Sequence, residues 1–98
     1  MEERLLFRLL TPQGERCRIP CDAVELTAKD DASGRGGGSL GVRRGHLPAV
    51  AALEEGGPVR VLSGGGTVYA ARVRGGFARI GREEVTVLTP EAEEGSDI

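Results

Sequence analysis

The chain has 98 residues, of which 16 are glycine and only three are aromatic. This length allows one small domain, and the glycine content argues against a helical bundle because each interior glycine costs a helix about 1 kcal/mol. A net charge of −2 and the shortage of aromatic side chains argue against a phosphate-tracking or base-stacking surface, so nucleic acid is not an expected partner.

Short apolar segments alternate with turn residues along the first half of the chain. Leu5–Leu10 is an apolar run followed by a turn-forming Thr-Pro-Gln-Gly sequence. Asp22–Thr27 alternates between apolar and polar side chains, as a half-buried strand does. Residues 28–38 are rich in glycine and charge and are expected to form a mobile loop. Ser39–Val42 is a further short strand, whereas His46–Leu53 fits either a helical turn or an extended segment.

The second half contains two predicted hairpins. Pro58–Leu62 and Thr67–Arg74 flank a glycine-rich loop, and Phe77–Ile80 and Glu84–Leu88 form the second pair. The Gly75-Gly76 dipeptide between the hairpins is suited to a two-residue turn with positive φ. Eight or nine short strands at this spacing predict an all-β protein, either a flattened antiparallel sandwich or a barrel.

The predicted domain covers residues 5–88, and residues 89–98 are expected to form an acidic flexible tail. This tail carries four acids and Pro90 but no apolar stripe that could dock it. No apolar run approaches the roughly 20 residues that a membrane span requires, so direct insertion into a membrane is not expected. The N-terminus lacks the features of a signal peptide, which favours an intracellular protein.

No motif predicts catalysis, a cofactor or a bound metal. Cys17 and Cys21 are expected to be reduced thiols, and the single histidine, His46, leaves a zinc site short of ligands. Residues 36–41 fit a dinucleotide-binding pattern and, through Ser39, a nucleophile-elbow pattern. Both patterns require a helix directly after the glycines, and none is expected here, so both matches are rejected. A hydrolase that uses Ser39 and His46 is retained only as a third hypothesis to be tested against the others.

Several segments, in the same order along the chain, resemble the epsilon subunit of F-type ATP synthases. Leu9–Glu15 is similar to the opening V-T-P-E-G-E hairpin of that family, and Val24–Leu26 is similar to its V-V-L strand. Leu40–Leu53 resembles L-G-I-L-P-G-H-A-P-L-L-A-A-L, and Gly75–Phe77 resembles a G-G-F hairpin. Val85–Leu88 matches a V-T-V-L strand, so the resemblance covers about residues 5–93.

The resemblance implies a sandwich of ten strands at the foot of the central rotor stalk. Such a domain is non-catalytic and couples the gamma subunit to the membrane c-ring during proton- or sodium-driven ATP synthesis, at the cytoplasmic face of the cell membrane. The side that faces the polar loops of the c-ring is expected to include Ser39, Arg43, Arg44, Gly45 and His46. The side that faces gamma is expected to include Gly75, Gly76 and Phe77.

Three departures from the family pattern affect these expectations. The chain stops where the family continues into two C-terminal helices, so it is expected to couple without inhibiting ATP hydrolysis and to bind no nucleotide. Arg43 and Arg44 stand where the family has Leu-Pro, and the glycine-rich loop is longer than usual. These two features motivate the alternative hypothesis of a stand-alone β-sandwich module that binds proteins of another complex.

Overall fold

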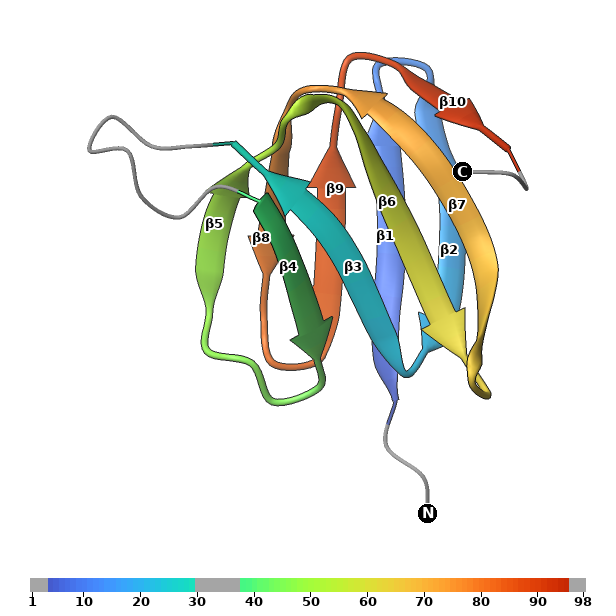
Figure 1. The fold of residues 1–98 in the computed structure, drawn as a ribbon, viewed down its shortest axis with the longest axis vertical. Helices are drawn as coiled ribbons and strands as arrows, with labels where there is room; N and C mark the ends of the chain where they lie inside the picture. The colour runs from blue at the N-terminus through green and yellow to red at the C-terminus, as the bar shows by residue number, and fades with distance from the viewer. Residues whose placement is uncertain (1–3, 30–37, 96–98) are drawn as a thin grey trace.

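The computed structural model describes residues 4–29 and 38–95, and within them the chain forms ten strands and no helix (Figure 1). The predicted all-β class is therefore confirmed, and no described segment is a helix that is long and apolar enough to cross a membrane. The strands are β1 (Leu5–Thr11), β2 (Gly14–Cys21), β3 (Ala23–Ala28), β4 (Gly38–Arg43), β5 (Ala49–Ala52), β6 (Glu55–Ser63), β7 (Gly66–Arg74), β8 (Phe77–Ile80), β9 (Glu84–Leu88) and β10 (Ala92–Glu94).

The strands form two sheets of five strands each, packed face to face. Sheet A has the order β2-β1-β9-β8-β5, and sheet B has the order β10-β7-β6-β3-β4. In Figure 1, sheet B lies in front of sheet A, and the strand ends gather at the upper and lower ends of the molecule. The predicted sandwich is confirmed, because both sheets cover the same interior.

One pair of strands departs from the antiparallel arrangement that the short turns predict. β1 and β9 run parallel at the centre of sheet A, with Leu6 beside Glu84 and Leu10 beside Leu88. All the other strand pairs in the described sheets are antiparallel. The chain crosses repeatedly between the sheets before β9 returns to β1, so a local turn does not set the relative direction of these two strands.

The core consists of the inward-facing residues of both sheets. Alternate residues of β1, namely Leu5, Phe7 and Leu9, have no exposed surface, as period-two alternation requires when one face is buried. Burying each such side chain contributes about 1.5–3 kcal/mol relative to leaving it in water. The Phe7 ring contacts the Tyr69 ring from sheet B at a centroid distance of 5.9 Å. Other fully buried core residues are Val24, Leu26, Val42, Val59, Val61, Val73, Val85 and Val87.

The two double-glycine turns have different roles. Gly64 and Gly65 join β6 to β7 with φ of 63° and 85°, the left-handed pair that a tight two-residue hairpin needs. Gly75 and Gly76 also have positive φ, but β7 belongs to sheet B and β8 to sheet A. The expectation of a hairpin at Gly75-Gly76 is therefore wrong, because the neighbour of β7 at this edge is β10 and the chain changes sheets at the two glycines.

The ordered sandwich continues beyond residue 88. β10 pairs with β7, with Ala92 opposite Val73 and Glu94 opposite Ala71, and Thr89 is buried. The structure therefore places β10 beyond the predicted domain boundary at residue 88, because the edge of β7 provides backbone partners that the sequence does not reveal. Residues 96–98, and positions 30–37 of the mobile loop predicted for residues 28–38, lie outside the described residues.

Candidate interaction surfaces

The turn that carries four of the candidate residues is fixed to a neighbouring turn. It joins β4 to β5, and Gly45 adopts a φ of 89°. The Gly45 amide donates a hydrogen bond to the Arg82 carbonyl over 2.7 Å. Arg44 Nη2 lies 3.0 Å from Glu83 Oε2, so a side-chain ion pair joins the same two turns. These contacts join this turn to the turn between β8 and β9 at the lower end of the sandwich (Figure 1).

His46 is positioned by backbone contacts at this turn. Its Nδ1 lies 2.7 Å from the Leu47 carbonyl oxygen, so Nδ1 carries the proton and donates when the ring is neutral. Its amide donates to the Arg43 carbonyl over 3.2 Å. Among residues 4–29 and 38–95, no three histidine, cysteine, aspartate or glutamate side chains are grouped as a metal site requires.

Ser39 does not lie with the turn. It pairs with Thr27 near the start of β4, whereas Arg43 pairs with Ala23 at the end of the same strand. Ser39 therefore lies at the opposite end of β4 from Arg43–His46, although the resemblance implies one surface for all five residues. β4 continues into the turn and then into β5 without a helix, so the geometry of a nucleophile elbow is absent around Ser39.

Gly75, Gly76 and Phe77 lie together at the opposite end of the molecule, where the chain crosses from β7 to β8 (Figure 1). A Cβ placed on Gly76 would lie 2.1 Å from the Leu88 carbonyl oxygen, so only glycine fits between the two sheets there. The Gly76 carbonyl accepts a hydrogen bond from the Leu53 amide over 2.9 Å. Phe77, directly after the glycines, is 55% exposed.

Phe77 belongs to a row of uncharged side chains on the outer face of sheet A. Register places Ala52 beside Phe77, Phe77 beside Leu88, and Leu88 beside Leu10. Directly paired residues project from the same face of a sheet, so the four form one row across β5, β8, β9 and β1. Leu88 is 40% exposed, and Val50, two residues before Ala52, is 68% exposed. Phe77, Leu88 and Val50 are thus three large apolar side chains that remain exposed on this face.

A polar belt borders the apolar row on the same sheet. Arg8 Nε lies 2.9 Å from Glu15 Oε2, and Arg8 Nη1 lies 3.6 Å from Glu84 Oε2. The Thr86 hydroxyl donates to Glu84 Oε2 over 2.8 Å, and Arg79 lies opposite Thr86. An apolar strip beside a hydrogen-bonded polar border is the usual composition of a protein–protein interface.

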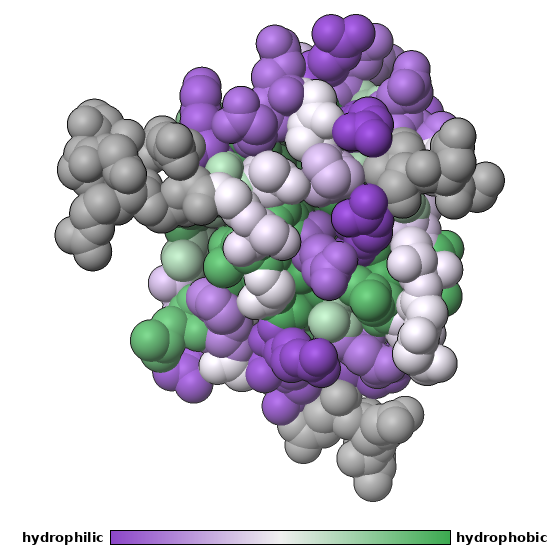
Figure 2. All heavy atoms as spheres, in the orientation of Figure 1, coloured by the Kyte–Doolittle hydropathy of each residue, from purple (hydrophilic) through white to green (hydrophobic). Residues whose placement is uncertain are grey.

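The outer face of sheet B is more mixed. Figure 2 views this face and shows hydrophilic side chains distributed among neutral and hydrophobic ones. Glu25 on β3 lies opposite Arg60 on β6, which places opposite charges in the middle of this sheet. Val68 is the one large apolar residue with more than a third of its surface exposed among the described strands of sheet B.

Cys17 and Cys21 are free thiols on β2. Cys21 is fully buried, and both side chains face the core. Burial is the main cause that raises the pKa of each thiol above its usual value, with nearby carboxylates adding to the effect at Cys17. The expected reduced thiols are thus in surroundings that disfavour the reactive thiolate form.

The sequence identified only part of these surfaces. It pointed to Phe77 and to the turn at Arg43–His46, but it missed Leu88 and Leu10 as members of the apolar row and the exposed Val50 next to it. The available signal was alternation within each strand, since Leu88 and Leu10 occupy the outward positions next to buried residues. The side-by-side placement of β1 and β9 could not be read from that alternation.

Comparison with known proteins gives matches over nearly the whole chain. A family model described as the ATP synthase delta/epsilon chain β-sandwich domain matches residues 5–95. ATP synthase epsilon chains of Bacillus thuringiensis and Bacillus mycoides are each 36% identical over 90 residues, or 92% of this chain. This chain spans 61% of the length of these curated relatives.

Solved structures share the fold at lower sequence identity. A chain of the Euglena gracilis mitochondrial ATP synthase superimposes with a TM-score of 0.77 at 23% identity, covering 96% of this chain and 55% of the other. A chain from the central stalk and c-ring of the Tetrahymena thermophila mitochondrial enzyme gives a TM-score of 0.68 at 11% identity, covering 93% and 66%. At these identities, the two superpositions establish the fold.

Proposed function

Because this chain belongs to the family of ATP synthase delta/epsilon β-sandwich domains, we propose that it serves as a central-stalk subunit of a rotary ATP synthase. In this role it holds the gamma subunit on one surface and faces the polar loops of the c-ring with another. The role is mechanical and non-catalytic. The domain sits at the cytoplasmic face of the membrane through its partners rather than by inserting into the bilayer.

The observation that carries this proposal is the apolar row of sheet A. Phe77 lies at its centre with more than half of its surface exposed, and Leu88 flanks it. Leaving such side chains in water is unfavourable, and a contiguous exposed apolar surface usually marks a site of protein association. Aromatic residues at the centre of such a surface often contribute most of the binding free energy. We assign this row to gamma.

The turn at Arg43–His46 is the proposed c-ring contact. It lies at the other end of β5 from Phe77, because Ala52 pairs with Phe77 and Ala49, nearest the turn, pairs with Ile80. Two partners can therefore contact the domain at once. The ion pair of Arg44 with Glu83 and the hydrogen bond of Gly45 to Arg82 support a rigid contact. Ser39 is left out of this surface because it lies at the far end of β4.

Co-expression with the gamma subunit of the same organism, followed by size-exclusion chromatography, tests the assignment. We expect the wild-type chain to co-elute with gamma and Phe77→Asp to weaken the complex by about 30-fold or more, the effect of losing a central aromatic anchor. Val68→Asp is the matched control, since it places the same charge at an exposed valine on sheet B. Failure of the wild-type chain to co-elute would favour the stand-alone binding module instead. Equal weakening by the two variants would contradict the assignment to the Phe77 surface.

A further inference from the structure

β10 is attached to the sandwich differently from the other strands. It has three residues, pairs with β7 alone among the described strands, and has two exposed side chains, those of Glu93 and Glu94. Among its residues only Ala92 packs against the hydrophobic core. Apolar burial therefore holds β10 weakly, and polar contacts must account for most of its attachment.

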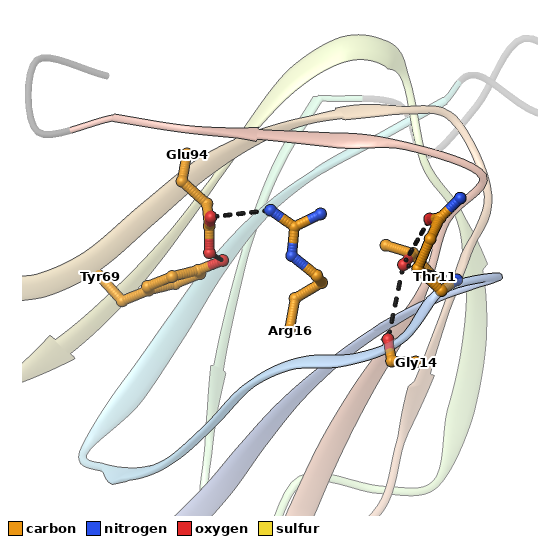
Figure 3. A network of polar contacts seen from close by, with 6 residues as sticks. Thr11, Gly14, Arg16, Tyr69 and Glu94 are labelled. Atoms are coloured by element: carbon orange, nitrogen blue, oxygen red, sulfur yellow. Dashed lines mark hydrogen bonds and ion pairs between the residues drawn. The ribbon is translucent and has the colours of Figure 1, made fainter.

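The Glu94 carboxylate makes the principal side-chain contacts of β10 (Figure 3). Its Oε2 accepts a hydrogen bond from the Tyr69 hydroxyl over 2.6 Å, and its Oε1 accepts one from Arg16 Nη2 over 3.0 Å. Tyr69 belongs to β7 of sheet B, and Arg16 belongs to β2, the edge strand of sheet A. One carboxylate thus joins the edges of the two sheets on this side of the sandwich.

Two backbone hydrogen bonds also attach this segment to β7, one at each end of β10. The Arg74 amide donates to the Glu91 carbonyl over 2.9 Å, and the Gly95 amide donates to the Ala70 carbonyl over 3.2 Å. These two bonds lie on either side of the three residues of β10. Few backbone bonds and little apolar burial are the properties of segments that open locally before the rest of a protein unfolds.

We propose that β10 is a clasp that opens as a unit, and that Glu94 is the residue that keeps it closed. In the closed clasp, β10 covers the backbone edge of β7, and the carboxylate ties this edge to β2. In the open clasp, the β7 edge and the Tyr69 hydroxyl become accessible while the other nine strands keep their packing. Hydrogen bonds to a charged group are stronger than those between neutral groups, so one carboxylate can decide the balance between the two states.

Hydrogen exchange of single amides in the full chain tests this proposal. We expect Glu94→Ala to speed exchange of the Arg74 and Gly95 amides by about tenfold or more, the effect of losing two hydrogen bonds to a charged group. Glu93→Ala is the matched control, because it removes the same atoms from the neighbouring position of the same strand. It should leave both exchange rates within about twofold of the wild type, as surface substitutions usually do.

The amides of β1 and β9 distinguish local opening from a general loss of stability. Under the proposal, the Arg74 and Gly95 amides of the wild type exchange faster than the amides of β1 and β9, and their exchange depends less on urea concentration, because opening the clasp exposes little surface. Equal rates and equal urea dependence at the clasp and in β1 and β9 would overturn the proposal, because they would show that β10 opens only with the whole domain. Equal effects of Glu94→Ala and Glu93→Ala would overturn it as well.

Discussion

The Tyr69 hydroxyl donates a hydrogen bond to Glu94 Oε2 over 2.6 Å, and Tyr69 is the single tyrosine of the chain. Burial, followed by this hydrogen bond to a carboxylate, raises the pKa of Tyr69 well above its usual value. Because there is one tyrosine, the ultraviolet absorbance of phenolate reports on this contact alone.

An alkaline titration of the folded chain should show the raised pKa of Tyr69 directly. A free tyrosine ionises near pH 10, whereas Tyr69 in the folded chain should stay protonated at that pH. Because the pKa of Tyr69 is higher in the folded chain than in the unfolded chain, this residue contributes to the free energy of unfolding. The contribution is complete below about pH 10 and is lost as the pH rises toward the folded-state pKa. Glu94→Ala should move the appearance of phenolate to lower pH. Ionisation of the wild type near pH 10 without unfolding would contradict the raised pKa.

The carboxylate partner has the opposite pH dependence. The hydrogen bond from Tyr69, and after it the Arg16 guanidinium, lower the pKa of Glu94. Because the pKa of Glu94 is lower in the folded chain, ionised Glu94 stabilises the fold at pH values above the usual glutamate pKa of about 4.3. This stabilisation is lost as the pH falls through the lowered pKa. The difference in urea midpoint between the wild type and Glu94→Ala should therefore shrink on acidification. A difference that stays constant from neutral to acidic pH would show that the charge of Glu94 plays no part.

Gly76 should tolerate no side chain. Gly76→Ala places a Cβ 2.1 Å from the Leu88 carbonyl oxygen and requires a φ of 102°, so we expect a loss of about 2–4 kcal/mol in the free energy of unfolding. Gly41→Ala is the control, since nothing lies within 4 Å of its Cβ and its φ is ordinary. Urea denaturation measures both variants. Equally small losses of stability in both variants would contradict this prediction, because they would show that the backbone between β7 and β8 can move to accommodate a Cβ.

The turn arginines should matter for coupling rather than for folding. Arg43→Ala with Arg44→Ala removes the ion pair of Arg44 with Glu83, and exposed pairs of this kind contribute less than about 1 kcal/mol. We expect a thermal midpoint within a few degrees of the wild type and weaker proton-driven ATP synthesis in vesicles reconstituted with the whole complex. Unchanged ATP synthesis would show that neither arginine belongs to the proposed c-ring surface. A thermal midpoint far below that of the wild type would show that the arginines support the fold.

The two thiols should react only when the fold opens. Burial raises the pKa of both Cys17 and Cys21 and so suppresses the thiolate that attacks disulfide reagents. We expect slow labelling of native protein, slowest at the fully buried Cys21, and rapid labelling of both thiols in denaturant. Rapid stoichiometric labelling of Cys21 in native protein would show that the β2 edge opens far more often than its packing indicates.

The sequence predicted strands well where local chemistry determines them. Alternation around Val24 and Leu26 gave β3, and the double glycine at Gly64-Gly65 gave the hairpin of β6 and β7, because a left-handed pair is needed there. The same type of dipeptide at Gly75-Gly76 gave a wrong hairpin. Two glycines with positive φ specify a change of direction, but they do not specify which sheet receives the next strand.

The features that the sequence did not reveal depend on distant residues. β10 is acidic and has no apolar alternation, so its partners on β7 and the Arg16 contact with Glu94 could not be inferred from residues 89–98. The apolar row likewise requires Leu10 to lie beside Leu88, which only the parallel pairing of β1 with β9 produces. The resemblance pointed to Phe77, but its neighbours come from strands far apart in the chain.

The parallel pairing of β1 with β9 also determines when the molecule can be completed during synthesis. β1 leaves the ribosome well before its neighbour β9, because seven other described strands lie between the two in the chain. Until β9 emerges, the nascent chain carries Leu5, Phe7 and Leu9 on a hairpin whose inward face has no finished sheet to pack within. Such non-local pairing slows folding and prolongs the exposure of apolar surface to other chains. The hairpin of β1 and β2 therefore stays exposed to aggregation until β9 has been made.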